Sequence, residues 1–199
     1  MKERPILFSA EMVRAILAGR KTQTRRVVKS PVSTHCNILG ISAEHEPMIL
    51  HKDDWFKPCE WSPYGIPGDR LWVRETWAAP GNWDDIKPSK LIEYPGFNTD
   101  LIAYRATEKF GDAYFTWRPS IFMPRWASRI LLEITDVRVE RLQEITMQDA
   151  IAESAPTLKG CPDPRVYFKD LWDEINADRG FSWDVNPWVW VIKFKVLKG

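Results

Sequence analysis

The chain is poor in the features that mark secreted, membrane-spanning and metal-dependent proteins. Its 199 residues include only three cysteines, which are widely separated and form no CxxC pair. They suggest neither a disulfide framework nor a zinc knuckle, and they favour a reducing, cytoplasmic location. No apolar run approaches the ~20 residues of a membrane span, and Pro5–Phe8 is too short for a signal-peptide core. We therefore expect no membrane partner.

Charge of one sign is also lacking, because the net charge of the whole chain is +1. The chain therefore has no strong overall positive potential of the kind that is typical of nucleic-acid-binding proteins. The charge is uneven, however: residues 1–30 hold eight cations and two anions, a local charge of +6. A local basic face on a nearly neutral protein fits a modest anionic ligand better than long duplex DNA.

Familiar catalytic motifs are missing as well. The chain contains no G-x-S-x-G, no HExxH, no P-loop and no GxGxxG that opens a helix. The proline-rich stretch 30–67 holds all three histidines and two cysteines, but their spacings match no metal-ligand pattern. These residues are His35, Cys36, His45, His51 and Cys59. We expect neither a metal ion nor another cofactor.

Tryptophan and proline are abundant, with 11 and 15 residues. Tryptophan offers a flat face on which bases stack, but a small sheet protein also uses it to fill its core and cover loops. For any single tryptophan the structural role is the default interpretation.

The hydrophobic pattern predicts a mixed, mainly antiparallel sheet with three or four flanking helices, and hence an α+β fold. Alternation predicts strands at Ile6–Phe8, Arg70–Trp77, Leu101–Thr107, Ala113–Trp117, Ser128–Val139 and Trp188–Val196. Capping signals predict helices from Ser9 to Gly19, from Thr146 to Glu153, and after Asp163-Pro164.

The stretch Ile16–Arg26, ILAGRKTQTRR, holds the highest concentration of basic and hydroxyl side chains in the chain. A helix is predicted to end at Gly19, and four cations, two threonines and an amide follow within seven residues. A threonine hydroxyl is a weak nucleophile that needs a base. Lysine serves as that base when burial or neighbouring cations depress its pKa. Lys21 and Thr24 are the candidates, and a solvated basic patch is the alternative.

The separation of Lys21 and Thr24 constrains the backbone. An odd separation within a regular strand places two side chains on opposite faces. The two residues can therefore meet only if the chain bends, which predicts irregular backbone around Thr22–Gln23.

Two carboxylates fall where local structure does not explain them. Glu75 shares a predicted strand face with Leu71 and Val73, so it either meets an arginine or lines a pocket. Glu153 ends a predicted helix, where an anion opposes the macrodipole, which indicates a salt bridge or a role in a site. Either carboxylate could orient a lysine or handle a leaving group.

The chain resembles the ASCH domain family, a branch of the PUA-like β-barrel superfamily. ILAGRKTQTRR is close to the family's helix-G-[RK]-K-T-x-T-x-R signature, and the resemblance continues through PGDRLWVRETW, RPSIFMPRWASRILLEITDVRVERL, ITMQDAIAES and NPWVWVIKF. It looks like the longer, tryptophan-rich members often carried by phages and prophages. It implies a single β-barrel domain over 1–199 with a loop-rich insertion around 78–115.

The resemblance also implies a reaction. A small bacterial member is an amidohydrolase that converts N(4)-acetylcytidine to cytidine and acetate. By motif position Thr24 would be the nucleophile, Lys21 its activating base and Glu153 the orienting or proton-handling carboxylate. Substrate contacts would come from cations of the motif and from an acidic and aromatic set elsewhere: Arg20, Arg25, Arg26, Glu75, Trp77, Arg125 and Trp126.

Other ASCH members are RNA-binding or ribonuclease-like, so two further functions stay open. The first is an RNA-binding module that uses the basic stretch and tryptophan faces on single-stranded RNA. The second is a ribonuclease, which would have to cleave without a histidine pair or a metal. The chain also departs from many longer members by reading Glu153-Ser154 where they have EG. The turn after that helix is therefore expected to differ.

Overall fold

The computed structural model describes residues 1–28, 38–41, 47–51, 54–56, 62–107, 115–155 and 163–197. The chain divides into two compact units, each built from separate stretches of sequence. The first unit holds Met1–Gly19, Arg70–Leu132 and Val196–Gly199, and the second holds Arg20–Asp69 and Glu133–Lys195. One boundary falls directly before Arg20, at the start of the basic stretch. A single domain over 1–199 stays a prediction.

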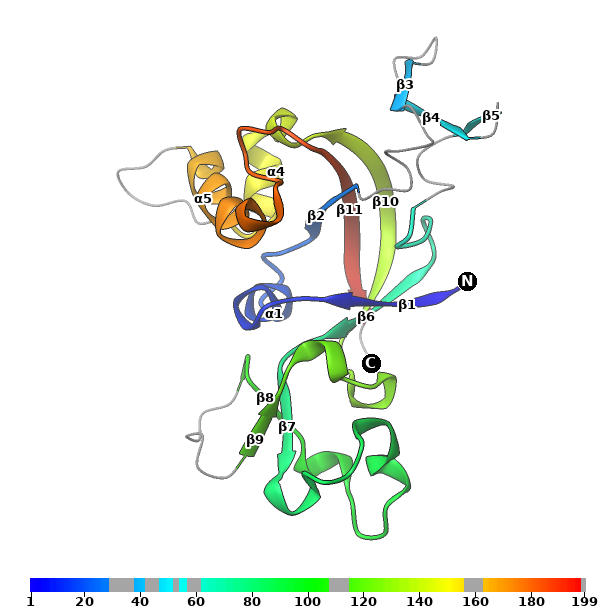
Figure 1. Cartoon of the computed structure of the whole chain (residues 1–199), viewed down its shortest axis with the longest axis vertical. Coiled ribbons are helices and arrows are strands. Elements are labelled where there is room, and N and C mark those ends of the chain that lie inside the picture. Colours follow the sequence, from blue (N-terminus) through cyan, green and yellow to red (C-terminus); the bar gives the residue numbers. More distant parts are fainter. Residues whose placement is uncertain are drawn as a thin grey trace. The chain divides into compact units, whose positions relative to one another are not determined.

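Among the residues that the structure describes, the first unit contains two small groups of strands and the α-helix α1 (Figure 1). Strand β1 (Glu3–Leu7) runs parallel to β6 (Arg70–Arg74), with Ile6 opposite Val73. Strand β7 (Trp77–Pro80) lies between β8 (Ala103–Tyr104) and β9 (Phe115–Arg118) and is antiparallel to both.

Helix α1 (Ala10–Leu17) begins and ends where its capping residues predict. The Ser9 hydroxyl accepts a hydrogen bond from Met12 N, and Gly19 follows the helix with a left-handed φ of 70°. Met12, Ala15 and Ile16 have the spacing of an apolar helix stripe, but the buried face differs from that stripe at one position. Val13, Ala15 and Ile16 are buried, whereas Met12 is only half-buried.

The predicted strand Arg70–Trp77 is two strands in the structure. Strand β6 ends at Arg74, the chain leaves the sheet at Glu75 and Thr76, and Trp77 opens β7. Likewise, the strand expected over Leu101–Thr107 is reduced to β8. The stretch after β7 contains short 3₁₀ helices around a core of Trp77, Ala79, Leu91, Met123 and Ala127. Those helices are Gly81–Trp83, Pro88–Glu93, Thr99–Leu101, Ser120–Phe122 and Arg125–Ala127.

The second unit is built around the strand order β10–β11–β2. Strand β2 (Gln23–Val27) pairs antiparallel with β11 (Trp188–Leu197), and most of β10 (Leu131–Arg141) belongs to this unit. A further antiparallel group consists of β3 (Ile38–Ile41), β4 (Pro47–His51) and β5 (Asp54–Phe56). The histidines and cysteines that we considered as metal ligands all have side chains outside the described part of the structure.

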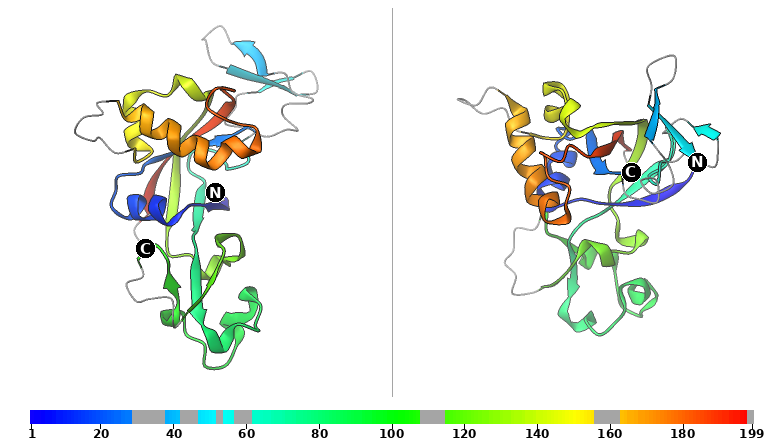
Figure 2. Two further views of the ribbon diagram at one scale, coloured as in Figure 1. Left: turned by 60° about the vertical axis from the view of Figure 1, so that its left-hand side comes forward. Right: turned by 45° about the horizontal axis from the view of Figure 1, so that its top comes forward.

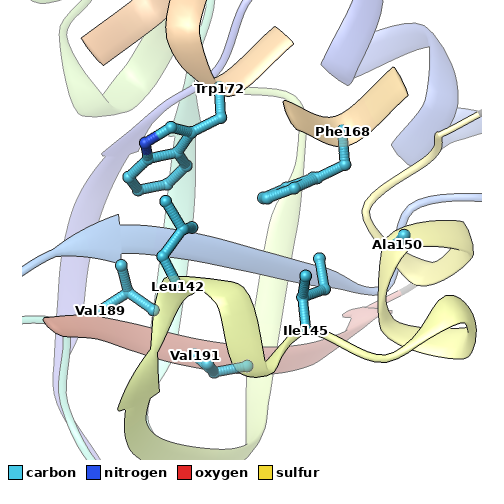
Figure 3. Close-up of a cluster of buried hydrophobic side chains, with 7 residues drawn as sticks. All are labelled: Leu142, Ile145, Ala150, Phe168, Trp172, Val189 and Val191. Carbon is cyan, nitrogen blue, oxygen red and sulfur yellow. The ribbon is translucent and has the colours of Figure 1, made fainter. Parts of the chain in front are cut away.

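Two helices pack against each other in the second unit, and both views of Figure 2 show them side by side. They are α4 (Met147–Ala152) and α5 (Pro164–Asn176), with Thr146 and Asp163 as their predicted N-caps. The helices share an apolar core with β11 and the turn after β10 (Figure 3). Its buried members are Leu142, Ile145, Ala150, Phe168, Trp172, Val189 and Val191.

Strand β11 is therefore buried on both faces near its start. The alternation of Trp188, Trp190 and Ile192 predicts one apolar face, with Lys193 and Lys195 marking the other as solvated. In the structure Val189 and Val191 face the helices while Trp190 and Ile192 are buried on the opposite side. Only Lys193–Lys195 alternate between exposed and buried residues in the expected way, and Val196, expected on the buried face, is 43% exposed.

The fold class expected from the sequence is confirmed as α+β, with parallel and antiparallel strand pairs and the helices α1, α4 and α5. The barrel is not confirmed, because the strand pairs of the described residues form open sheets. Within the described ranges, no helix is long and apolar enough to cross a membrane.

Helix α4 ends in a left-handed turn although no glycine is present. Ser154 has a φ of 73°, its N–H donates to Ile151 O at 2.8 Å, and Ala155 N–H donates to Ala150 O at 2.9 Å. This is the hydrogen-bond pattern of a Schellman motif, in which glycine usually occupies the left-handed position. The chain thus keeps, with serine, a turn of the kind that glycine usually makes, and this turn sets the position of Glu153.

We expect Ser154→Gly to stabilise the protein by about 1 kcal/mol, because a left-handed conformation costs an L-residue about 1–2 kcal/mol and glycine much less. The reciprocal change is Gly19→Ser, at the equivalent position after α1, where the space around the residue is open. It should destabilise by a similar amount. Urea denaturation of both variants measures the two effects, and equal signs would contradict the explanation.

Candidate functional site

The segment before β2 is held in place by two backbone hydrogen bonds. Thr22 N donates to Ala152 O in α4 at 2.9 Å, and Phe194 N in β11 donates to Thr22 O at 2.9 Å. Regular strand structure begins only at Gln23, so Lys21 and Thr22 precede it. The irregular backbone predicted around Thr22–Gln23 is not seen at Gln23, and the hydrogen bond from Phe194 continues the β2–β11 register to Thr22.

Lys21 is a buried lysine that meets the end of α4. Its side chain is 1% exposed, and Nζ donates to Glu153 Oε2 and to the Glu153 main-chain oxygen, both at 3.1 Å. Glu153 is itself 5% exposed and forms the C-cap of α4. The macrodipole argument indicated a salt bridge or a site role for this residue, and the salt bridge is present.

Burial lowers the pKa of Lys21 below its ordinary value of 10.5. The charges of Arg26 and Arg25 lower it further, while the carboxylate and hydrogen bond of Glu153 act in the opposite direction. The direction agrees with the prediction for a lysine base, and removal of the ammonium from water is its main cause.

Arg25 binds the other oxygen of the same carboxylate. Its Nη1 donates to Glu153 Oε1 at 3.1 Å, and its Nη2 donates to Glu140 Oε1 and, at 3.3 Å, to Asp149 Oδ2. The guanidinium side chain is not exposed, and its Cζ lies 5.8 Å from the centre of the Phe168 ring. Arg25 is thus surrounded by three carboxylates and an aromatic ring.

Arg138 completes this network from β10. It donates to Glu140 Oε2 at 2.8 Å and to Asp149 Oδ2 at 3.3 Å. Burial raises the pKa of Asp149, but Arg25 and Arg138 outweigh burial, and that pKa is lowered overall. The cluster balances three cations (Lys21, Arg25, Arg138) against three anions (Glu140, Asp149, Glu153), which is what makes their burial tolerable.

The structure brings together two of the three predicted catalytic residues directly, Lys21 and Glu153. Thr24 is 2% exposed and lies opposite Ile192 in the β2–β11 pair. Because neighbouring residues of a strand alternate, its side chain is on the opposite face of β2 from Arg25. Within the described part of the chain no hydrogen bond joins the Thr24 hydroxyl to Lys21 or Glu153.

The other cations of the motif differ in exposure. Arg20 is exposed, whereas Arg26 is half-buried. Burial lowers the pKa of Arg26, and Tyr64 and Glu153 oppose that effect. Arg26 and Tyr64 interact through charge. Burial raises the pKa of Tyr64, and the positive charge of Arg26 lowers that pKa in part. Tyr64 was not anticipated, since it lies in a proline-rich loop with no signal of its own.

Glu140, Asp149 and Arg138 were also missed by sequence reasoning. Arg138 and Glu140 alternate with Val137 and Val139 along β10, a pattern typical of an ordinary solvated strand face, and Glu140 lies beyond the predicted end of the strand at Val139. Asp149 follows Thr146 by three residues in a T-x-x-D capping box, which accounts for an acidic residue there, and the Thr146 hydroxyl accepts from Asp149 N at 3.1 Å. Within the described residues, no group of His, Cys, Asp or Glu side chains is arranged to hold a metal ion.

Glu75, a predicted substrate contact, is buried in the first unit and paired with an arginine. Arg129 binds it in a bidentate manner, with Nε–Oε1 of 2.9 Å and Nη2–Oε2 of 3.0 Å. The same guanidinium lies 4.0 Å from the centre of the Tyr104 ring. Of the two roles left open for Glu75, the structure gives it the arginine partner.

The aromatic residues predicted as substrate contacts also belong to the first unit. Trp77 is fully buried in its core and meets Trp126 edge to face, with ring centres 6.0 Å apart. Trp126 is half-buried, and exposed Arg125 forms an ion pair with Glu3 at 2.9 Å. These contacts explain the packing of the three residues, and their role in substrate binding stays a prediction.

No protein-family model matches the chain, and no curated protein matches it. Among solved structures, the chain is similar to an ASCH domain from Lactobacillus crispatus JV V101, with 10% sequence identity and a TM-score of 0.44. The match covers 98% of this chain and 79% of that one. The ASCH family is also the one that the sequence resembles. A likeness this distant bears on neither the reaction nor the residues that perform it.

The lowered pKa of Lys21 predicts a pH-dependent stability. Unfolded Lys21 titrates at about 10.5, so between the folded pKa and 10.5 the unfolded chain holds more protons. The contribution of Lys21 to the free energy of unfolding therefore rises with pH across that window. Lys21→Met removes this contribution, so the stability of the variant minus that of the wild type should fall as pH rises.

Urea denaturation from about pH 7 to about pH 10.5 measures this difference. Lys193→Met, at an exposed position of β11, is the matched control for loss of one lysine. A stability difference for Lys21→Met that stays constant over the window would contradict the lowered pKa.

Proposed function

We propose that the protein is an amidohydrolase that removes an acyl group from an N-acylated cytidine or a similar modified nucleoside. The observation that carries the proposal is the buried Lys21 ammonium held by Glu153. A lysine with a lowered pKa yields a free amine more readily than an exposed one, as a general base requires. Thr24, three residues further along the same motif, supplies the hydroxyl.

In the proposed reaction a water molecule passes the proton of the Thr24 hydroxyl to the Lys21 amine, because the two side chains are not hydrogen-bonded directly, as the Thr24 oxygen attacks the acyl carbonyl carbon. The C–N bond then breaks, and the Lys21 ammonium returns the proton to the departing N4 amine of cytidine. Water, deprotonated by the same amine, hydrolyses the acyl-threonine ester and releases the carboxylic acid. Glu153 orients Nζ throughout.

The arginines of the motif take different roles in this proposal. Arg25 is enclosed by carboxylates, so it positions the site rather than touching the substrate. Arg26, which interacts with both Tyr64 and Glu153, is the better candidate for a substrate contact, and exposed Arg20 is suited to bind a phosphate.

The test is turnover of N(4)-acetylcytidine, followed by mass spectrometry. We expect Thr24→Ala and Lys21→Ala each to lower kcat/KM at least about 100-fold, because each removes a group that acts in the transition state. Thr22→Ala removes an exposed threonine two residues away and serves as the matched control. Unchanged turnover in Thr24→Ala would exclude the assigned nucleophile, and a wild type inactive on acylated cytidines would exclude the reaction.

A second candidate function is binding of single-stranded RNA without catalysis, which the exposed Arg20 and the local charge of the first 30 residues favour. The rings of Trp188 and Trp117 are covered by Arg141 and Arg105, with 4.3 and 5.0 Å from guanidinium carbon to ring centre, which leaves less aromatic face for stacking.

If RNA binding is the function, affinity for a single-stranded oligonucleotide should fall steeply with salt, and Arg20→Ala should reduce both affinity and the salt slope. Fluorescence anisotropy at low and moderate salt measures both quantities. An absence of binding at low salt would remove this alternative, whatever the outcome of the acetylcytidine assay.

A further inference from the structure

The carboxylate of Glu153 is divided between two cations of the same short segment. Lys21 Nζ binds Oε2 and Arg25 Nη1 binds Oε1, each at 3.1 Å. The division is asymmetric, because Nζ also donates to the main-chain oxygen of Glu153, whereas the other end of Arg25 is bound by Glu140 and Asp149. Arg25 thus fixes the carboxylate from a position that is itself anchored in β10 and α4.

We propose that Arg25 is a positioning residue for the Lys21 base: by engaging one oxygen of Glu153, it limits the hold of that carboxylate on the Lys21 ammonium. This inference rests on the proposed function only for its meaning in catalysis. The physical claim, that Arg25 acts on Lys21 through Glu153, holds or fails without any substrate.

Removal of Arg25 changes the electrostatic surroundings of Lys21 in two ways, and both favour the protonated ammonium. The charged groups that face Lys21 are Glu153 at the end of α4, and Arg25 and Arg26 in β2. Without Arg25, a nearby positive charge is lost, and Glu153 Oε1 loses the donor that Arg25 provided. Both changes favour the ammonium, so the proton should bind more tightly and the amine should become free only at higher pH.

The experiment is a titration of Lys21 by NMR in protein with isotope-labelled lysine side chains, with the Lys21 signal assigned by its loss in Lys21→Met. In Arg25→Met we expect the titration midpoint of Lys21 to rise by about one pH unit, which corresponds to about tenfold tighter proton binding. Arg138→Met is the matched control. It removes an arginine from Glu140 and Asp149 but leaves both oxygens of Glu153 engaged, so its shift should be much smaller.

A double-mutant cycle separates the route through Glu153 from direct repulsion between the two cations. In the Glu153→Gln background, Arg25→Met should move the Lys21 midpoint by less than half of its effect in the wild type. An equal shift in both backgrounds, or a shift no larger than that of Arg138→Met, would overturn the proposal.

Arg25→Lys covers the case in which Arg25→Met does not fold, because it keeps a cation in the network. One ammonium cannot bridge Glu153 and Glu140 as a guanidinium does. The Lys21 midpoint should still rise, by less than in a variant without the charge, and a midpoint unchanged from the wild type would overturn the proposal. If the wild type hydrolyses acylated cytidines, the alkaline shift should also appear in the pH profile of kcat/KM. If it does not, the NMR result still decides the role of Arg25, and only the proposed function fails.

Discussion

A carboxylate withdrawn from water is the constraint on which the second unit depends. Glu153 is almost fully buried, and an ionised carboxylate is tolerated there only if donors replace its hydration. Lys21 and Arg25 provide those donors, one to each oxygen. The same pairing joins the end of α4 to the segment that leads into β2. A single requirement for charge compensation thus fixes the place of a helix end, a strand start and two cations.

The pairing of opposite charges continues from Glu153 toward the surface, through residues that are progressively less buried. Arg25 needs more acceptors than Glu153 provides, so Glu140 and Asp149 meet its second nitrogen, and Arg138 in turn meets them. Arg138 is 32% exposed and returns the network to solvent. Such a graded arrangement leaves Lys21 and Arg25, at 1% and 0% side-chain exposure, as the least hydrated members of the network. A buried pair of this kind is weak evidence for stability alone, which is consistent with a role in setting protonation.

Local signals predicted the parts of the fold that depend on a few neighbouring residues. The caps at Ser9, Thr146 and Asp163 are where the sequence placed them, because a capping side chain bonds to backbone only two or three residues away. The break between β6 and β7 was missed because Glu75 and Trp77 continue a strand-like pattern. The chain nevertheless leaves the sheet there, and Glu75 meets Arg129, 54 residues further on. Only tertiary contact decides such a case.

The sequence predicted which kinds of residue form the site, but it did not predict which of them contact one another. Dense cations and a carboxylate unfavourable to its own helix were visible in Lys21, Arg25 and Glu153. The enclosure of Arg25 was not visible, because Glu140 comes from a strand whose polar residues look like a solvated face. The second buried face of β11 was not predicted for a similar reason, because the residues that bury it come from α4 and α5. The barrel implied by the family resemblance also went beyond what the strand pairs form.

The pairing of Lys21 with Glu153 also has a consequence for how the protein is made. The two residues are 132 positions apart, so their contact is of very high sequence separation. Contacts of this kind form late, after the entropy of closing a long loop has been overcome. During synthesis from the N-terminus, the basic segment therefore leaves the ribosome long before its acidic partner exists. Until Glu153 arrives, Lys21 is an ordinary hydrated lysine, and the distinctive property of this segment belongs to the finished chain alone.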